Sequence, residues 1–270
     1  MSYELIGLDL DGTLTDSNKE ISENTRRALF RLMEKGKKVV LVSGRSIYGV
    51  MPLARELKLD QYDGYVMGFN GGQVVSCRTG EVLHDYLLPG GVAESVYKVT
   101  SSYQDVALIT YHQDTIITGR RTNQYVELEA FGSRMAVRET DHFAEETAGL
   151  SLNKVVACGD PVYISEIMVK LKDKFGASLN LFTSDPYFGE VMPKGIDKGY
   201  SLQMLVESLG FTSNQVICCG DSGNDIPMIR YAGLGVAMGN ALPEVKAAAD
   251  YVTLTNDEEG VLHVIEKYML

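Results

Sequence analysis

The sequence predicts an α/β protein: a doubly wound, Rossmann-like core of parallel strands, with a smaller α+β domain inserted in the middle of the chain. Near both ends, apolar runs with β character alternate with amphipathic helical stretches. This alternation is typical of parallel sheets built with right-handed crossovers. Between about residues 90 and 188, mixed helices and alternating strands replace it, and such a mixture is typical of an α+β domain.

The core begins with three apolar strands separated by two helices. The predicted strands are Tyr3–Leu10, Lys38–Val42 and Gly64–Phe69. Apolar residues at helical spacing predict a helix over Ser22–Lys35, with Ser22 as its N-cap and Gly36 at its end. A second helix is expected over Ser46–Leu59.

A hairpin, the inserted domain and the rest of the core follow. The hairpin turns at Arg78–Gly80. In the inserted domain we expect the helices Ala93–Tyr103 and Pro161–Phe175 and the strands Val106–Tyr111 and Thr115–Thr118. The core pattern then returns as a helix from Lys198 to Leu209, strands at Val216–Cys219 and Leu234–Ala237, and helices from Asp225, after Asn240 and after Asp257. Residues 1–85 and 189–270 are therefore expected to form a discontinuous core domain, and residues 86–188 the inserted domain.

Composition and charge exclude several classes of partner. The 270-residue chain carries 36 acidic and 25 basic side chains, for a formal net charge of −11. Because binding to a phosphate backbone or an anionic membrane needs clustered Lys and Arg, we expect neither a nucleic-acid nor a membrane partner. The cysteines lack C-x-x-C spacing, which disfavours structural zinc and a disulfide framework. No run approaches the ~18 apolar residues of a membrane span, and the acidic N-terminus is unlike a signal peptide, so we expect a cytoplasmic location.

Polar segments follow four of the predicted core strands. They are Asp9-Leu10-Asp11-Gly12-Thr13, Ser43-Gly44-Arg45, Asn70-Gly71-Gly72 and Gly220-Asp221-Ser222-Gly223-Asn224-Asp225. In open parallel sheets, ligands bind beyond the carboxyl ends of the strands. The four segments are therefore expected to converge on one crevice.

The aspartates of these segments predict a metal site. Asp9 and Asp11 are two residues apart, so in extended backbone both carboxylates point to the same face, beside Asp221 and Asp225. Such a cluster repels itself unless a cation compensates, and an all-oxygen acidic site suits Mg²⁺. The alternative is that the loop aspartates cap helices or turns. Asp221 at a matching strand end favours the metal site.

Two further features indicate an anion. Ser43 and Gly44 offer a hydroxyl and approachable backbone N–H groups near a helix start, although Ser43 could also simply cap that helix. Lys198 lies just before the helix predicted from Gly199. A lysine near the acidic cluster would help neutralise a phosphoryl group. A solvated surface lysine is the alternative, and Lys194 is a second candidate.

With these segments, the sequence resembles the haloacid dehalogenase-like phosphohydrolase superfamily. The segments DLDGTL at 9–14, SGR at 43–45, the lysine of DKGYSL at 197–202 and GDSGND at 220–225 match its four motifs in order and spacing. The NGG at 70–72, the long insertion and VAMGNA at 236–241 further resemble the Cof-type subfamily, whose members carry a large α/β cap. The inserted domain would then be the cap, in which no motif is readable.

The resemblance implies a role for each residue of the predicted crevice. Asp9 would be the nucleophile that forms an aspartyl-phosphate, and Asp11 the general acid and base. Mg²⁺ would be held by the side chains of Asp9 and Asp221 and by the backbone carbonyl of Asp11. The phosphoryl oxygens would be bound by Ser43, the N–H groups of Leu10 and Gly44, Lys198 and Asn224. Asp225 would orient Lys198 or a metal-bound water, and Arg45 and Asn70 would touch the leaving group.

The expected function is hydrolysis of small phosphorylated metabolites, with sugar phosphates favoured, by a Mg²⁺-dependent phosphatase whose cap closes over the site. One alternative is a phosphomutase of the same superfamily, which would accumulate isomerised sugar phosphate rather than free phosphate. Another is a non-enzymatic, phospho-accepting receiver-like switch. The long insertion and the second acidic loop at 220–225 argue against the switch.

Overall fold

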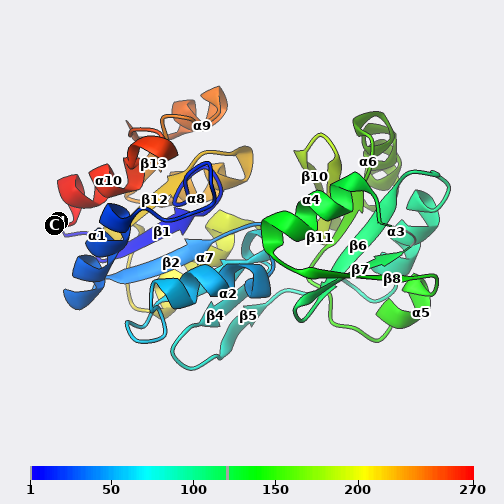
Figure 1. Ribbon diagram of the computed structural model, residues 1–270, viewed down its shortest axis with the longest axis horizontal. Coiled ribbons are helices and arrows are strands. Elements are labelled where there is room, and N and C mark those ends of the chain that lie inside the picture. The colour runs from blue at the N-terminus through cyan, green and yellow to red at the C-terminus, as the bar shows by residue number, and fades with distance from the viewer. Residues whose placement is uncertain (1, 120–121) are drawn as a thin grey trace. The chain divides into compact units, whose positions relative to one another are not determined.

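The computed structural model describes residues 2–119 and 122–270 and divides the chain into two compact units. The first unit contains the residues up to His84 and Asp197–Leu270, and the second contains Asp85–Ile196. Each unit has its own sheet (Figure 1). The second unit continues past the expected return at residue 189, because β11 (Phe188–Pro193) pairs with β9 (Val155–Cys158) and β10 (Leu179–Asp185).

The sheet of the first unit has the strand order β14-β13-β12-β1-β2-β3-β4-β5. Its strands are β1 (Leu5–Asp9), β2 (Lys38–Val42), β3 (Tyr65–Gly68), β4 (Gln73–Ser76), β5 (Val82–Asp85), β12 (Val216–Gly220), β13 (Leu234–Ala237) and β14 (Tyr251–Val252). Neighbouring strands from β14 to β3 are parallel, and β4 pairs antiparallel with β3. The predicted doubly wound α/β core is confirmed. Residues from both ends of the chain meet where β1 lies between β12 and β2.

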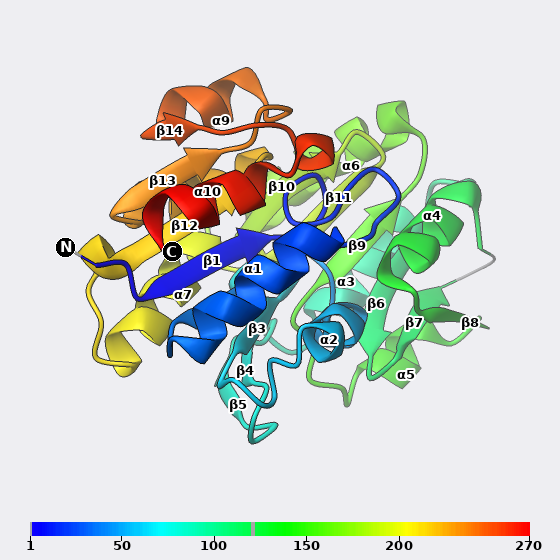
Figure 2. The ribbon, with the colours of Figure 1, turned by 60° about the vertical axis from the view of Figure 1, so that its left-hand side comes forward.

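Helices cover both faces of this sheet. They are α1 (Glu23–Glu34), α2 (Ile47–Glu56), α7 (Lys198–Ser208), α8 (Ile226–Tyr231), α9 (Pro243–Ala248) and α10 (Gly260–Tyr268), with short 3₁₀ turns η1 (Phe69–Gly71), η2 (Ser213–Gln215), η3 (Gly223–Asp225) and η4 (Asn256–Glu258). Figure 2 shows α1, α2 and α10 on one face. Ile6 and Leu8 pack on that face, whereas Leu5 packs with Leu202 and Leu205 of α7 on the other. Because side chains alternate along a strand, β1 is buried on both sides, and its carboxyl end is held rigidly.

The sheet of the second unit has the order β10-β11-β9-β6-β7-β8. The remaining elements are β6 (Ala107–His112), β7 (Thr115–Gly119), β8 (Ala136–Thr140), α3 (Val92–Thr100), α4 (Gln124–Ser133), α5 (Phe143–Thr147) and α6 (Pro161–Phe175). Most pairs are antiparallel and only β7–β8 is parallel among those described, as expected of an α+β domain. In the part of the chain that the structure describes, no helix is long and apolar enough to cross a membrane.

The four cysteines are buried and not in disulfides. Burial raises the pKa of the Cys77 thiol to about 12 and raises the pKa of Cys218 and Cys219 well above the usual value. A thiol with a raised pKa is a poor nucleophile and a poor metal ligand. These buried side chains are therefore packing residues.

Candidate active site

Three carboxylates meet at the carboxyl ends of β1 and β12. Asp9 is the last residue of β1, Asp221 follows β12, and Asp225 ends η3. One oxygen of each carboxylate lies within 4.8 Å of the others. The parallel pairing of β1 with β12 brings together segments that are far apart in the sequence. The expected convergence of these strand ends is present for Asp9, Asp221 and Asp225.

Lys198 lies among these carboxylates as a buried ammonium. It is the first residue of α7, whose N-cap is Asp197, and it is only 1% exposed. Its Nζ is 2.6 Å from Oδ1 of Asp9 and 2.6 Å from Oδ1 of Asp225. Burial lowers the pKa of Lys198, but the charges of Asp225 and Asp9 outweigh it and raise the pKa above the usual value. Lys198 therefore stays charged, and it is not the solvated surface lysine of the alternative interpretation.

Asp225 binds Lys198 and the backbone of the loop after β12. Its Oδ1 accepts from Lys198, and its Oδ2 accepts from the backbone N–H groups of Asp221 and Ser222, each at 3.0 Å. Asp225 is fully buried, and its carboxylate bonds to one ammonium and two backbone N–H groups. This geometry fits the expected role of orienting Lys198.

Asp9 and Asp221 carry more negative charge than Lys198 alone can balance. Burial raises the pKa of Asp9 well above the usual value, and the charge of Asp225 raises it further. Burial, followed by the charge of Asp225, also raises the pKa of Asp221. Thr13 Oγ1 donates to Oδ1 of Asp221 at 2.9 Å and Ser222 Oγ to Oδ2 at 3.2 Å, which fixes this carboxylate. Such an all-oxygen acidic site fits a hard divalent cation.

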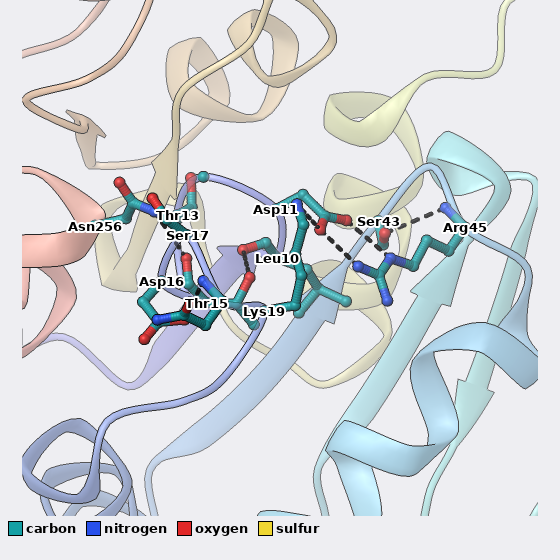
Figure 3. Close-up of polar contacts among 12 residues, drawn as sticks. Leu10, Asp11, Thr13, Thr15, Asp16, Ser17, Lys19, Ser43, Arg45 and Asn256 are labelled. Atoms are coloured by element: carbon teal, nitrogen blue, oxygen red, sulfur yellow. Dashed lines mark hydrogen bonds and ion pairs between the residues drawn. The ribbon is translucent and has the colours of Figure 1, made fainter. Parts of the chain in front are cut away.

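Asp11 is not among the three carboxylates that lie within 4.8 Å of one another, and the extended backbone from which we predict that it shares the face of Asp9 does not continue to Asp11. β1 ends at Asp9, and the chain then turns, with Leu14 N donating to Asp9 O. The alternation of an extended strand therefore does not reach Asp11. Its carboxylate instead pairs with Arg45 and Lys19 (Figure 3). Burial raises the pKa of Asp11, but hydrogen bonds from Arg45 and Lys19 outweigh it and lower the pKa below the usual value.

Ser43 and Gly44 follow β2, with Ser43 buried and Gly44 half-buried. Ser43 is 2% exposed, its N–H donates to Met67 O, and its Oγ accepts from Arg45 N at 3.2 Å. The N-cap of α2 is Ser46, whose side chain accepts from Gly49 N. The alternative interpretation of Ser43 as a helix cap is therefore wrong. Leu10, also proposed to bind phosphate, is fully buried, and its carbonyl accepts from Thr13 and Thr15.

Asn70 connects the loops after β2 and β12. Its backbone N–H donates to Ser43 O, and its Oδ1 accepts from Asn224 Nδ2 at 2.9 Å. Asn70 has a φ of 52°, in the left-handed region that Asn tolerates better than most residues. A Cβ on Gly44 would lie 3.2 Å from Asn70 Oδ1, so glycine permits this close approach. Asn70 thus bonds to both Ser43 and Asn224, and the sequence does not indicate these two contacts.

Three residues that contact these aspartates are not among the site residues that the sequence predicts. Lys19 contacts Asp11, whereas Thr13 and Ser222 contact Asp221. Thr13 and Ser222 lie inside the quoted motifs, so their position beside the aspartates was a usable signal. Lys19 lies outside every motif, and only the fold of the loop after β1 brings it to Asp11.

Comparison with known proteins finds similarity along the whole chain. Residues 6–265 match the haloacid dehalogenase-like hydrolase family. The chain is 32% identical to the 5-amino-6-(5-phospho-D-ribitylamino)uracil phosphatase YcsE of Bacillus subtilis, over 100% of this chain and 97% of that protein. A haloacid dehalogenase-like hydrolase from Bacteroides thetaiotaomicron is 42% identical with a TM-score of 0.94, covering 98% of this chain and 99% of that one.

A second solved structure is similar as well. BT1666 of Bacteroides thetaiotaomicron, described among phosphatases of the haloalkanoate superfamily, is 26% identical with a TM-score of 0.82. The alignment covers 99% of this chain and 95% of that one. With the match over residues 6–265, these similarities confirm the resemblance carried by the four motifs: the chain belongs to the haloacid dehalogenase-like hydrolase family.

Proposed function

We propose that this phosphatase is Mg²⁺-dependent and hydrolyses small phosphorylated metabolites, with sugar phosphates and related polyol phosphates favoured, through an aspartyl-phosphate on Asp9. The observation that carries the proposal is the buried cluster in which Lys198 lies between Asp9 and Asp225, beside Asp221. The name of the relative YcsE, which gives a phosphorylated ribityl chain as its substrate, supports the substrate class.

Asp9 and Asp221 are the side chains that would hold Mg²⁺, together with the backbone carbonyl of Asp11 that the family resemblance implies. Their oxygens form the donor set that Mg²⁺ prefers, and Asp225 would instead support Lys198 and the loop after β12. When bound, Mg²⁺ shields negative charge and orients the phosphoryl oxygens.

Asp9 is the nucleophile of the proposed reaction. Its carboxylate oxygen forms a bond to phosphorus while the bond from phosphorus to the leaving-group oxygen breaks. The protonated form of Asp11, which Arg45 and Lys19 disfavour until substrate binds, gives that oxygen a proton. Water then attacks phosphorus, gives a proton to Asp11 and releases phosphate from Asp9. The contact with Lys198 orients the Asp9 carboxylate for the attack.

The remaining residues bind the phosphoryl oxygens. Ser43, the N–H groups of Leu10 and Gly44, Lys198 and Asn224 supply the hydroxyl, N–H and ammonium donors. Phosphoryl transfer depends mainly on positioning and on stabilisation of charge. The bonds of Asn70 to Ser43 and Asn224 support these donors in a fixed arrangement.

A substrate screen tests the proposal. Purified protein with Mg²⁺ is assayed for free phosphate against phosphorylated sugars, polyols, nucleotides and cofactors. Release of phosphate from sugar or polyol phosphates, dependent on Mg²⁺, is expected. Accumulation of an isomerised sugar phosphate without free phosphate would establish the phosphomutase instead. A long-lived aspartyl-phosphate without turnover would establish the receiver-like switch.

Asp221→Asn should weaken Mg²⁺ binding, with the dissociation constant rising at least about 10-fold.

For the unchanged protein, the affinity for Mg²⁺ should rise with pH, because Asp9 and Asp221 have raised pKa values and must lose protons before they bind a cation. Isothermal titration calorimetry at pH 5.5 and 7.5 measures both effects. An Asp221→Asn protein that binds Mg²⁺ normally would exclude Asp221 as a ligand.

Gly12→Ala should weaken both the fold and cation binding. Gly12 has a φ of 80°, and a Cβ there would lie 2.6 Å from Oδ2 of Asp221. Gly36→Ala is a matched control, because Gly36 has the same φ of 80° with nothing within 4 Å of its Cβ. In urea unfolding, the free energy of unfolding of both variants should fall by about 1–2 kcal/mol, because alanine is strained in the left-handed backbone region. Only Gly12→Ala should also bind Mg²⁺ more weakly in calorimetry. Equal Mg²⁺ affinities of the two variants would contradict the proposal that Asp221 is a metal ligand.

A further inference from the structure

The carboxylate of Asp11 is held by three donors from two cations. Arg45 Nε donates to Oδ2 at 2.8 Å and Nη2 to Oδ1 at 2.5 Å, and Lys19 Nζ donates to Oδ1 at 2.8 Å (Figure 3). Oδ1 thus receives two donors and Oδ2 receives one. An acid and base must also meet the leaving-group oxygen or water, and Oδ1, whose two lone pairs are both engaged, can do so only if one of its two contacts opens.

The two cations differ in how firmly they are held. The Arg45 side chain is 11% exposed. Its backbone N–H donates to Ser43 Oγ, and its carbonyl accepts from Phe69 N at 2.8 Å. The guanidinium also binds through a planar fork of two parallel bonds, which sets the direction of a carboxylate as well as its distance.

Lys19 is held loosely by comparison. Its side chain is 46% exposed and contacts Asp11 through a single atom at the end of a flexible stem. It lies on a tight turn in which Asp16 N donates to Glu20 O. An exposed, single ion pair of this kind contributes little and exchanges readily with water. Loss of this contact frees a lone pair of Oδ1 while the Arg45 fork stays in place.

Asp11 needs a firmly held partner such as Arg45 because of its position in the chain. It lies beyond the end of β1, and its side chain is 38% exposed. Neighbouring side chains therefore do not confine it as they confine Asp9, which is 7% exposed. Without a fixed partner the carboxylate would sample several rotamers, and misplacement by about 1 Å costs about 10²-fold in rate.

We propose that Arg45 is the positioning residue of Asp11 and that Lys19 is the contact that opens when substrate binds. The inference rests on the proposed function, because it concerns the acid and base of that reaction. In this proposal Arg45 does not touch the leaving group, although the family resemblance implies that contact, but acts on the reaction by positioning Asp11.

The test compares Arg45→Gln and Lys19→Gln in the Mg²⁺-loaded full chain, with a polyol phosphate as substrate. Arg45→Gln should lower kcat about 10²-fold with little change in KM, whereas Lys19→Gln should lower kcat far less. In an Asp11→Asn background, Arg45→Gln should cause almost no further loss, because both changes remove the same function. With p-nitrophenyl phosphate, whose leaving group needs no proton, the burst of nitrophenolate should survive in Arg45→Gln.

Arg78→Gln is the matched control, since it breaks another arginine–aspartate pair, between Arg78 Nε and Asp63 Oδ1 at 2.6 Å, on an exposed turn. It should not change kcat. A raised KM for Arg45→Gln that persists in the Asp11→Asn background would overturn the proposal, because Arg45 would then contact substrate directly. Equal losses for Lys19→Gln and Arg45→Gln would overturn the role given to Lys19. Failure of the proposed function itself looks different, since the unchanged protein would then release no phosphate.

Discussion

Asp9→Asn should release phosphate at least about 10⁴-fold more slowly than the unchanged protein, because an amide oxygen is a poor nucleophile toward phosphorus. The fold should survive the change. The Asn side chain has the same shape, and its oxygen can still accept from Lys198, which now donates to Oδ1 of Asp9 at 2.6 Å. The substitution also removes the buried charge of Asp9, which burial disfavours, as the raised pKa of this carboxyl group indicates.

Steady-state release of phosphate from a polyol phosphate, with Mg²⁺ present, measures this effect. Asp63→Asn is the control, because Asp63 is a half-exposed carboxylate that pairs with Lys38 and Arg78 on the surface. It should leave turnover unchanged. Turnover of Asp9→Asn within about tenfold of the unchanged protein would exclude Asp9 as the nucleophile.

Lys198→Met should cost both activity and stability. Lys198 is 1% exposed and compensates Asp9 and Asp225, which are 7% and 0% exposed. Removing one partner of a buried ion pair leaves an uncompensated charge and costs about 3–5 kcal/mol. The rate of phosphate release should also fall about 10³-fold, because Lys198 both orients Asp9 and stabilises charge on the phosphoryl group.

The stability loss of Lys198→Met should grow with pH. Burial already raises the pKa of Asp9, and loss of the ammonium raises this pKa further. A folded state with a raised carboxyl pKa binds more protons than the unfolded state. Its relative stability is therefore greatest below about pH 4 and is lost as the pH rises through the folded pKa.

Urea unfolding without metal, at pH 5 and pH 8, measures this dependence. Lys172→Met, which changes an exposed lysine of α6, is the control and should show no pH-dependent loss. A Lys198→Met protein that unfolds within about 1 kcal/mol of the unchanged protein at pH 8 would contradict the account of the buried cluster.

Elements with strong local signals could be predicted from the sequence. Lys38–Val42, Pro161–Phe175 and Leu234–Ala237 have the predicted bounds. An apolar run set off by polar residues defines a buried strand, and Asp160 followed by Pro161 defines a helix start. The strand ends that carry Asp9 and Asp221 could be located because their motifs follow such runs.

Contacts that depend on the path of the backbone between elements could not be predicted. The direction of Asp11 is set by the turn after β1, by Lys19 of the same loop and by Arg45 of the loop after β2, and no local pattern in the sequence indicates these contacts. Asn70 reaches Asn224 because its φ is 52°, which the residue type permits but does not require. The second unit extends to Ile196 because β11 pairs with β9, a contact between residues distant in the sequence.

The most direct test of the central claim is to trap the phosphorylated residue. The protein, loaded with Mg²⁺ and substrate, is quenched during turnover and treated with borohydride, which reduces an aspartyl-phosphate to homoserine. Peptide mass spectrometry then locates the change. We expect homoserine at position 9, and no such product in Asp9→Asn. Phosphate release without any modification of Asp9, or with modification at another residue, would contradict the proposed mechanism.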